Sequence, residues 1–180
     1  RDLIDITNND FQRVSAVSIG VIFLIIAVLY VSPTLPFLLV LLIEFAIFVN
    51  MAIPCYTGTV LPFIASIVIG TIQLGATVDY AILMTTRYRT ERNSGKDKKE
   101  AVTIALTTSI PSILASALSF FGSTFGVGVY SSIDMISSLC LLMARGAIIS
   151  MISVICILPA MFMIFDKLII KTSFTFKVRN

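Results

Sequence analysis

Asp79 and Tyr80 are the neighbouring residues of this 180-residue chain whose types and positions most directly indicate chemistry. Asp79 interrupts an apolar run that opens at Thr59, and Arg87 closes the run eight residues after the acid. A carboxylate inside a membrane span costs a few kcal/mol to insert, and such acids mostly face a bundle interior or a wet pathway. A phenol can donate or accept a hydrogen bond beside it. The pair indicates a proton relay within a membrane, although a helix-packing acid with a structural hydrogen bond would use the same residue types.

The surroundings of Asp79 on its own helix are small and polar. Thr71, Gly75, Asp79 and Thr86 fall on one helical stripe, so they share a face. Small residues on such a stripe let a neighbouring helix approach closely. Thr71 and Gly75 are therefore candidate accessory residues of the site.

Glu44 is a second acid within an apolar run. It lies eight residues after Pro36, and Asp79 lies eight residues before Arg87. At 1.5 Å per residue both acids are about 12 Å from the same membrane surface. They could share a proton, or Glu44 could be neutral and face a different helix, because the sequence does not set the rotation of each helix.

The composition places the chain in a membrane and excludes several functions. It is 57% hydrophobic and 13% charged, against about 25% charged residues in soluble domains. It has no histidine, and its three cysteines have no metal-site spacing, so we expect no metal and no cofactor. Basic residues lie beside membrane spans, which gives no indication of nucleic-acid binding. An intramembrane aspartyl protease would need two facing aspartates, and we expect no enzyme here.

The hydropathy pattern predicts an all-α membrane protein with five transmembrane helices. The apolar runs that define the spans cover residues 14–31, 36–53, 59–86, 101–121 and 146–165. Residues 1–13 predict a polar helix or linker, or else a frayed end, and residues 167–180 predict a basic cytoplasmic tail. The Gly- and Ser-rich residues 122–132 predict a loop, and residues 134–143 predict a separate short helix near the outer surface. Pro54–Gly58 predicts another loop.

Two features inside the later spans concern packing. Pro111 and Pro159 each remove a backbone hydrogen bond and predict kinks. Five serines recur at spacings of three and four, which predicts a polar face for close helix packing. They are Ser109, Ser112, Ser116, Ser119 and Ser123. Ser112 and Ser116 are candidates for contact with the Asp79 helix. Arg145 is expected near the outer interface, reaching water or lipid phosphate.

The connection at residues 87–100 carries six basic side chains and sets the topology. Positive residues beside spans hold their loops in the cytoplasm. With five spans, the basic connection and the basic tail both lie inside if the N-terminal segment is outside. Asn93-Ser94-Gly95 predicts the end of one helix, and Asp97 with Glu100 predicts a capping box at the start of the next.

Several of these motifs resemble the MMPL family of the RND superfamily of transporters. Gly-Ala-Thr-Val-Asp-Tyr at 75–80, followed by the basic run at 87–92, is similar to the fourth helix of a half-transporter in that family. Ala144-Arg145-Gly146-Ala147 and Leu158-Pro159-Ala160 resemble the start and end of its last helix. The first residue is not Met, so we expect a piece of a longer protein, the end of its second half.

The resemblance implies a proton-driven exporter of lipid-like or amphipathic molecules in the cell membrane. Asp79 and Tyr80 would form the proton relay, and the missing N-terminal half and extracellular domain of the same transporter would be its partners, besides membrane lipids. Residues 1–13 would then lead out of that extracellular domain. Sterol-sensing domains resemble the same five-helix arrangement without all being pumps, so a lipid- or sterol-sensing or scaffolding module is the alternative function.

Overall fold

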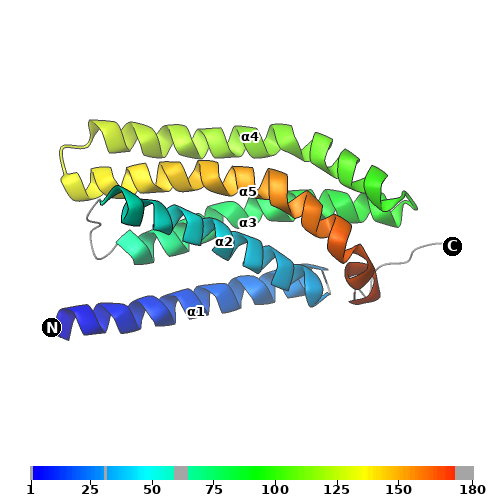
Figure 1. Ribbon diagram of the computed structural model, residues 1–180, viewed down its shortest axis with the longest axis horizontal. Helices are drawn as coiled ribbons and strands as arrows, with labels where there is room; N and C mark the ends of the chain where they lie inside the picture. Colours follow the sequence, from blue (N-terminus) through cyan, green and yellow to red (C-terminus); the bar gives the residue numbers. More distant parts are fainter. Residues whose placement is uncertain (1, 31, 59–64, 173–180) are drawn as a thin grey trace.

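The computed structural model describes residues 2–30, 32–58 and 65–172, and they form five α-helices (Figure 1). The helices are α1 (Asp2–Tyr30), α2 (Thr34–Thr57), α3 (Ala65–Asn93), α4 (Lys98–Tyr130) and α5 (Asp134–Thr172). Each contains a stretch long and apolar enough to cross a membrane. The described part of the chain contains no β-strand. The prediction of an all-α membrane protein with five spanning helices is confirmed.

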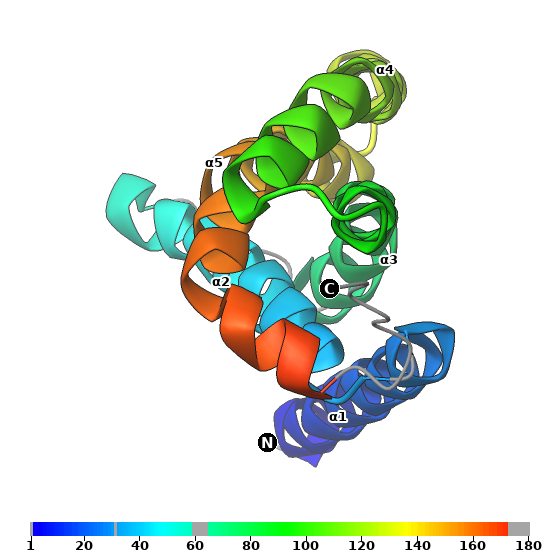
Figure 2. The same cartoon turned by 90° about the vertical axis from the view of Figure 1, so that its right-hand side faces the viewer.

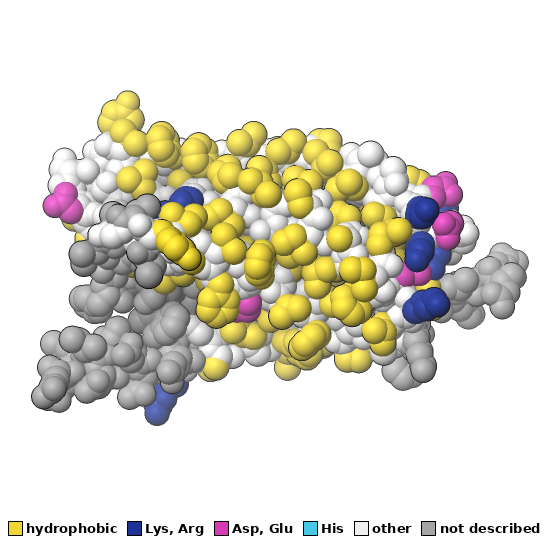
Figure 3. Space-filling model, viewed as in Figure 1, with side chains coloured by type: hydrophobic (Ala, Val, Ile, Leu, Met, Phe, Trp, Pro, Cys, Tyr) yellow, Lys and Arg dark blue, Asp and Glu magenta, His cyan; other side chains and the backbone are white. Residues whose placement is uncertain are grey.

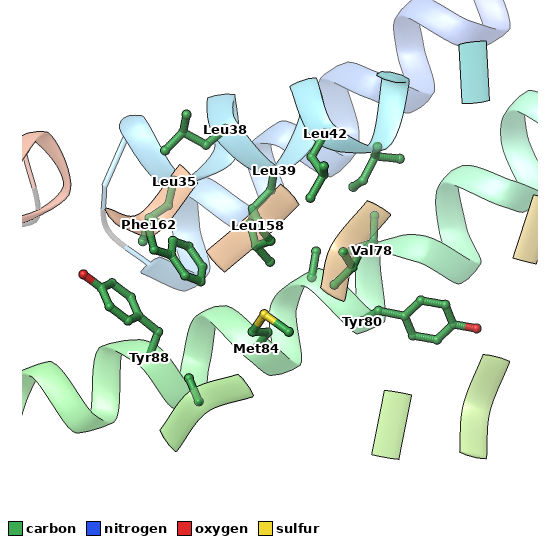
Figure 4. Close-up of a cluster of buried hydrophobic side chains, with 14 of the residues drawn as sticks. Leu35, Leu38, Leu39, Leu42, Val78, Tyr80, Met84, Tyr88, Leu158 and Phe162 are labelled. Atoms are coloured by element: carbon green, nitrogen blue, oxygen red, sulfur yellow. The ribbon is translucent and has the colours of Figure 1, made fainter. Parts of the chain in front are cut away.

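The helices run side by side along the long axis, and α1 lies at the edge of the bundle (Figures 1 and 2). The main apolar core takes buried side chains from all five helices, with α1 contributing least. Leu39, Met84, Leu158 and Phe162 in this core are almost completely buried (Figure 4). Lipid does not favour helix association by a hydrophobic effect, so van der Waals packing and polar contacts between helices must hold the bundle together.

The surface divides into apolar flanks and charged ends. Hydrophobic side chains cover the middle of the face in Figure 3, and the Lys and Arg side chains in that view gather mostly at one end. We call this the basic end; it carries the α3–α4 connection at residues 94–97. The other end, where α4 passes into α5, is called the opposite end. This division is the one expected of a bundle that crosses a bilayer.

Three predicted loop or helix boundaries at the opposite end are wrong. Residues 122–130 continue α4 and form no loop, residues 134–143 are the first part of α5 and form no separate helix, and α2 runs through Pro54 to Thr57. The range 59–64, where we placed the start of the third span, lies outside the described residues, and α3 begins at Ala65. Glycine and serine gave the false loop signal, because in isolation they disfavour helix.

The packing of α4 on α5 explains why α4 continues through residues 122–130. A Cβ atom on Gly128 would lie 2.9 Å from the Leu141 side chain, so only glycine permits this approach. Ser137 donates to the Gly128 carbonyl at 2.6 Å. Ser123 and Thr124 direct their hydroxyls back to carbonyls of the preceding turn. The small residues serve helix contact and do not end the helix.

The connection at the basic end is partly as predicted. Gly95 adopts a left-handed φ of 85°, which glycine accepts without strain, and α3 ends just before it. Asp97 occupies the N-cap position of α4, but its side chain makes no capping hydrogen bond, so the capping box with Glu100 is absent.

Prolines lie inside both long helices, Pro111 in α4 and Pro159 in α5. Figure 1 shows both helices bending on their way to the basic end. A proline ring removes the amide donor for the carbonyl four residues earlier and clashes with that carbonyl.

Candidate proton-relay site

Asp79 lies on an exposed strip of α3. The strip comprises Ile72, Gly75, Asp79 and Thr86, all exposed in the bundle, and we call it the Asp79 face. The candidate span of α3 begins at Val68, and its uncharged part ends before Arg87, apart from Asp79 itself. Asp79 is therefore about 16 Å from Val68 and about 12 Å from Arg87. The acid is near the middle of the span and on its outer surface, not in the interior of these five helices.

Tyr80 points in a different direction from Asp79. Its side chain is only 5% exposed and belongs to the apolar core. Figure 4 shows the ring pointing away from the leucine cluster of α2 and α5. No hydrogen bond joins Asp79 to Tyr80 in the described residues, as expected for adjacent helical positions about 100° apart. The structure therefore places the acid outward and the phenol inward.

Glu44 lies apart from Asp79, near the middle of α2. It is half-buried and lines a cavity with Thr71 and Leu74 of α3. Asp79 is not among the residues lining that cavity, and no hydrogen bond or ion pair among the described residues joins the two acids. Thr71, placed beside Asp79 by the helical stripe, contributes to the Glu44 side of α3, while Gly75 stays on the Asp79 face.

The serine stripe of α4 mostly faces outward. Ser112, Ser116, Ser119 and Ser123 are exposed, and only Ser109 is buried. Within this five-helix bundle the serine face is therefore mostly uncovered, and the accessory roles of Ser112 and Ser116 stay predictions. Alanines and Ile113 make the buried surface of α4 instead.

A buried polar network that our sequence analysis did not predict joins α2, α3 and α5 near the opposite end. Asn50 donates its amide to Gln73 Oε1 at 2.8 Å and to the Leu142 carbonyl at 3.2 Å. Gln73 donates to Ser150 Oγ at 3.0 Å. Asn50 and Gln73 are 0% and 3% exposed. In an apolar interior each of these side-chain amides must find hydrogen-bond partners, and here the two amides bond to one another.

Arg145 completes this Asn50–Arg145 network. Its guanidinium donates to Asn50 Oδ1 and to the Asn50 carbonyl, both at 2.9 Å. The expectation that Arg145 reaches out to water or lipid phosphate is therefore wrong. The guanidinium fork matches two oxygens of a single residue, and this arrangement holds α5 against α2.

Asp166 forms the corresponding cluster at the basic end. It is 6% exposed and accepts from Arg92 Nε at 3.1 Å and Arg92 Nη2 at 2.9 Å. The Tyr88 hydroxyl donates to the same carboxylate, and the Tyr88 ring stacks on Phe162 at 4.5 Å. Arg92 also donates to the Lys96 carbonyl at 2.8 Å, which ties the α3–α4 connection to the cluster. This Arg92–Asp166 pair fixes the basic ends of α3 and α5.

Tyr30 anchors α1 on the edge of the Asp79 face. Its hydroxyl donates to the Ile82 carbonyl at 2.9 Å and lies 2.8 Å from Thr86 Oγ1. The Arg89 guanidinium lies over the Tyr30 ring at 5.1 Å from its centroid. These contacts join α1 to α3 at the basic end of the Asp79 face.

The topology contained a signal for both clusters. Asn50 near the end of the second span and Arg145 near the start of the fifth lie at one membrane surface, as do Arg92 and Asp166 at the other. A polar or charged residue beside a span, with a possible partner at the same depth, predicts such a contact. The partner helix and its rotation could not be obtained in this way.

Comparison with known proteins places the chain in a family. It is 27% identical over 159 residues to the membrane protein ActII-3 of Streptomyces coelicolor. That match covers 86% of this chain, while the chain spans only 22% of the length of ActII-3. No solved structure matches. The model of the MMPL family matches residues 1–172, almost the entire chain, and the five spanning helices agree with it. The chain belongs to the MMPL family.

Proposed function

We propose that this chain is the membrane-embedded half of a proton-motive-force-driven exporter of lipid-like or amphipathic molecules. Asp79 carries the coupling proton, and Tyr80 assists its transfer. The missing half and an extracellular domain of the same transporter are the partners. Membership of the MMPL family and the resemblance of residues 75–92 to the fourth helix of an RND half-transporter support this proposal.

The observation that carries the proposal is the exposed position of Asp79 in the middle of the α3 span. A carboxylate facing lipid at this depth would cost a few kcal/mol even when the bilayer adapts. A second protein surface or a water path over the Asp79 face would remove that cost. Exposed Gly75 beside the acid gives a second helix room to approach. The half-transporter proposal supplies such a surface.

The mechanism follows from the charge of Asp79. The acid takes up a proton from one side of the membrane, becomes neutral, and releases the proton to the other side. Each charge that crosses the membrane is worth about 2.3 kcal/mol per 100 mV, so a few protons can drive a rocking motion of the two halves. Tyr80 lies inside the bundle on the same helix as Asp79, so rotation of either side chain would change the distance between the phenol and the acid.

The localisation in this proposal is the cell membrane, with the N-terminal end of the chain outside and the C-terminal end in the cytoplasm. The basic end then faces the cytoplasm, in accord with the positive-inside rule.

Transport by the full-length protein in liposomes with an imposed proton gradient tests the proposal. Asp79→Asn keeps the size and removes the titratable group, so export should stop while insertion and melting temperature stay unchanged. Tyr80→Phe should slow export without stopping it. Asp134→Asn is the matched control, because Asp134 is an exposed acid at the start of α5, and export should stay normal.

Normal export by the Asp79→Asn variant would contradict the proposal. The proton site would then lie elsewhere, and a lipid-sensing or scaffolding module would become the better interpretation.

A further inference from the structure

A second candidate site lies away from the Asp79 face, between α1, α2 and α3. It is a cavity of about 550 Å³, within the roughly 300–1,000 Å³ that small-molecule sites occupy. Most of its lining is apolar, with Ile19, Ile47 and Leu74 among the contributing residues. We call it the Glu44 cavity.

Among the described residues that line this cavity, Glu44 is the only charged one. Ser15 and Ser18 of α1 add hydroxyls, and none of the described lining residues carries a positive charge. The Glu44 carboxylate is half-buried, and no hydrogen bond or ion pair with it is found among the described residues. By contrast, Asp166 has Arg92 and Tyr88 as partners.

Glu44 also lies where a second hollow begins. This more open groove of about 560 Å³ runs between α2 and α5, and Glu44 and Phe48 line both spaces. Its other lining residues are apolar, for example Leu41 and Met161. An acid at the junction of two apolar spaces can hold a polar headgroup while an alkyl chain occupies one of them.

We propose that the Glu44 cavity binds an amphipathic amine. Its ammonium group pairs with the Glu44 carboxylate, and its alkyl chain lies along Ile19, Ile47 and Leu74. The charge decides the ligand class. A cation supplies the counter-charge that no described lining residue provides, a neutral lipid leaves the acid unpaired, and an anion is repelled. The apolar lining requires the chain.

This inference deepens the proposed function, and it rests on that function only in treating the amine as a transport substrate. Binding itself depends on Glu44 and the cavity, not on Asp79. The two ideas therefore fail separately: loss of transport in Asp79→Asn leaves amine binding intact, and loss of amine binding in Glu44→Gln leaves the Asp79 proposal untouched.

Equilibrium binding of radiolabelled hexadecylamine to the full-length protein in uncharged maltoside micelles tests the proposal, with hexadecan-1-ol as the neutral probe of equal length. The wild type should bind the amine at least tenfold more tightly than the alcohol. Glu44→Gln should remove this preference and leave alcohol binding unchanged. Asp79→Asn is the matched control and should keep the preference. Ser18→Phe should fill the cavity and weaken both probes.

Equal binding of amine and alcohol by the wild type would overturn the proposal, as would an amine preference that survives Glu44→Gln. If Ser18→Phe leaves amine binding unchanged, the alkyl chain lies elsewhere and the assignment of the cavity fails. Loss of export in Glu44→Gln with an unchanged amine preference would assign Glu44 to proton transfer and also overturn the proposal.

Discussion

Gly146→Ala provides a sharp test of the Asn50–Arg145 network. A Cβ atom on residue 146 would lie 2.6 Å from Gln73 Oε1 and 2.7 Å from Asn50 Nδ2. These two atoms form the central hydrogen bond of the network, at 2.8 Å. Neither amide can simply turn away, because both are buried and each has a further partner on α5. The substitution must therefore break this hydrogen bond or push α5 away from α2 and α3.

The expected magnitude follows from these two costs. Forcing a methyl group into a packed interior costs about 1–3 kcal/mol. Leaving a buried amide without its partner costs about 1–3 kcal/mol more. Alanine regains about 0.5–1 kcal/mol over glycine in a helix. We expect Gly146→Ala to lower the free energy of unfolding by about 3 kcal/mol on this basis.

The assay is SDS-driven unfolding of the full-length protein, followed by circular dichroism. Gly122→Ala is the matched control, since Gly122 lies in α4 and nothing lies within 4 Å of its Cβ position. It should change stability by less than about 1 kcal/mol, in the stabilising direction. Gln73→Ala should partly relieve the Gly146→Ala defect, because the small side chain removes the clash. If Gly146→Ala unfolds like the wild type, the network geometry described above is wrong.

Three further predictions concern the basic end and the topology. Arg92→Gln should lower the free energy of unfolding by about 1–3 kcal/mol, because buried Asp166 loses its charge partner. Arg87→Gln is the control and should not change the free energy of unfolding, because Arg87 is exposed. Equal effects of the two substitutions in the same unfolding assay would contradict the role of the Arg92–Asp166 pair. With native cysteines removed, Ser132→Cys in intact cells should react with an impermeant thiol reagent and Lys96→Cys should not; labelling of residue 96 from outside would overturn the topology. The hydrogen bond to Glu91 raises the pKa of Lys96. The contact therefore contributes to folding stability below that pKa, and this contribution is lost as pH rises through it. Glu91→Gln should lower the Lys96 pKa in an NMR titration, and an unchanged pKa would show that the contact is absent in solution.

The sequence predicted the features that depend on one segment at a time. Apolar runs of membrane length gave the five helices, and Gly95 gave the turn after α3. The depth of Asp79 in its span also follows from counting residues along one helix. The roles of Asp79 and Tyr80 remain predictions.

Features that depend on how helices meet could not be predicted in this way. Residues 122–130 contain helix-disfavouring glycines, yet the contact of Gly128 with Leu141 keeps them in α4. Arg145 has Asn50 as its partner only because of how α2 and α5 are rotated. Helix rotation is set by packing between neighbours, which no single segment encodes.

The proline of α4 lies at the same height as the candidate acid of α3. Pro111 is 13 residues from Lys98 at the start of α4, and Asp79 is 14 residues from Asn93 at the end of α3, so both are about 20 Å from the short connection that joins these adjacent helices. Pro111 divides α4 into a short arm at the basic end and a long arm packed on α5. A change of angle between the two arms would pivot at the membrane depth of Asp79. The short arm at the basic end would then tilt, while the long arm keeps its contacts with α5.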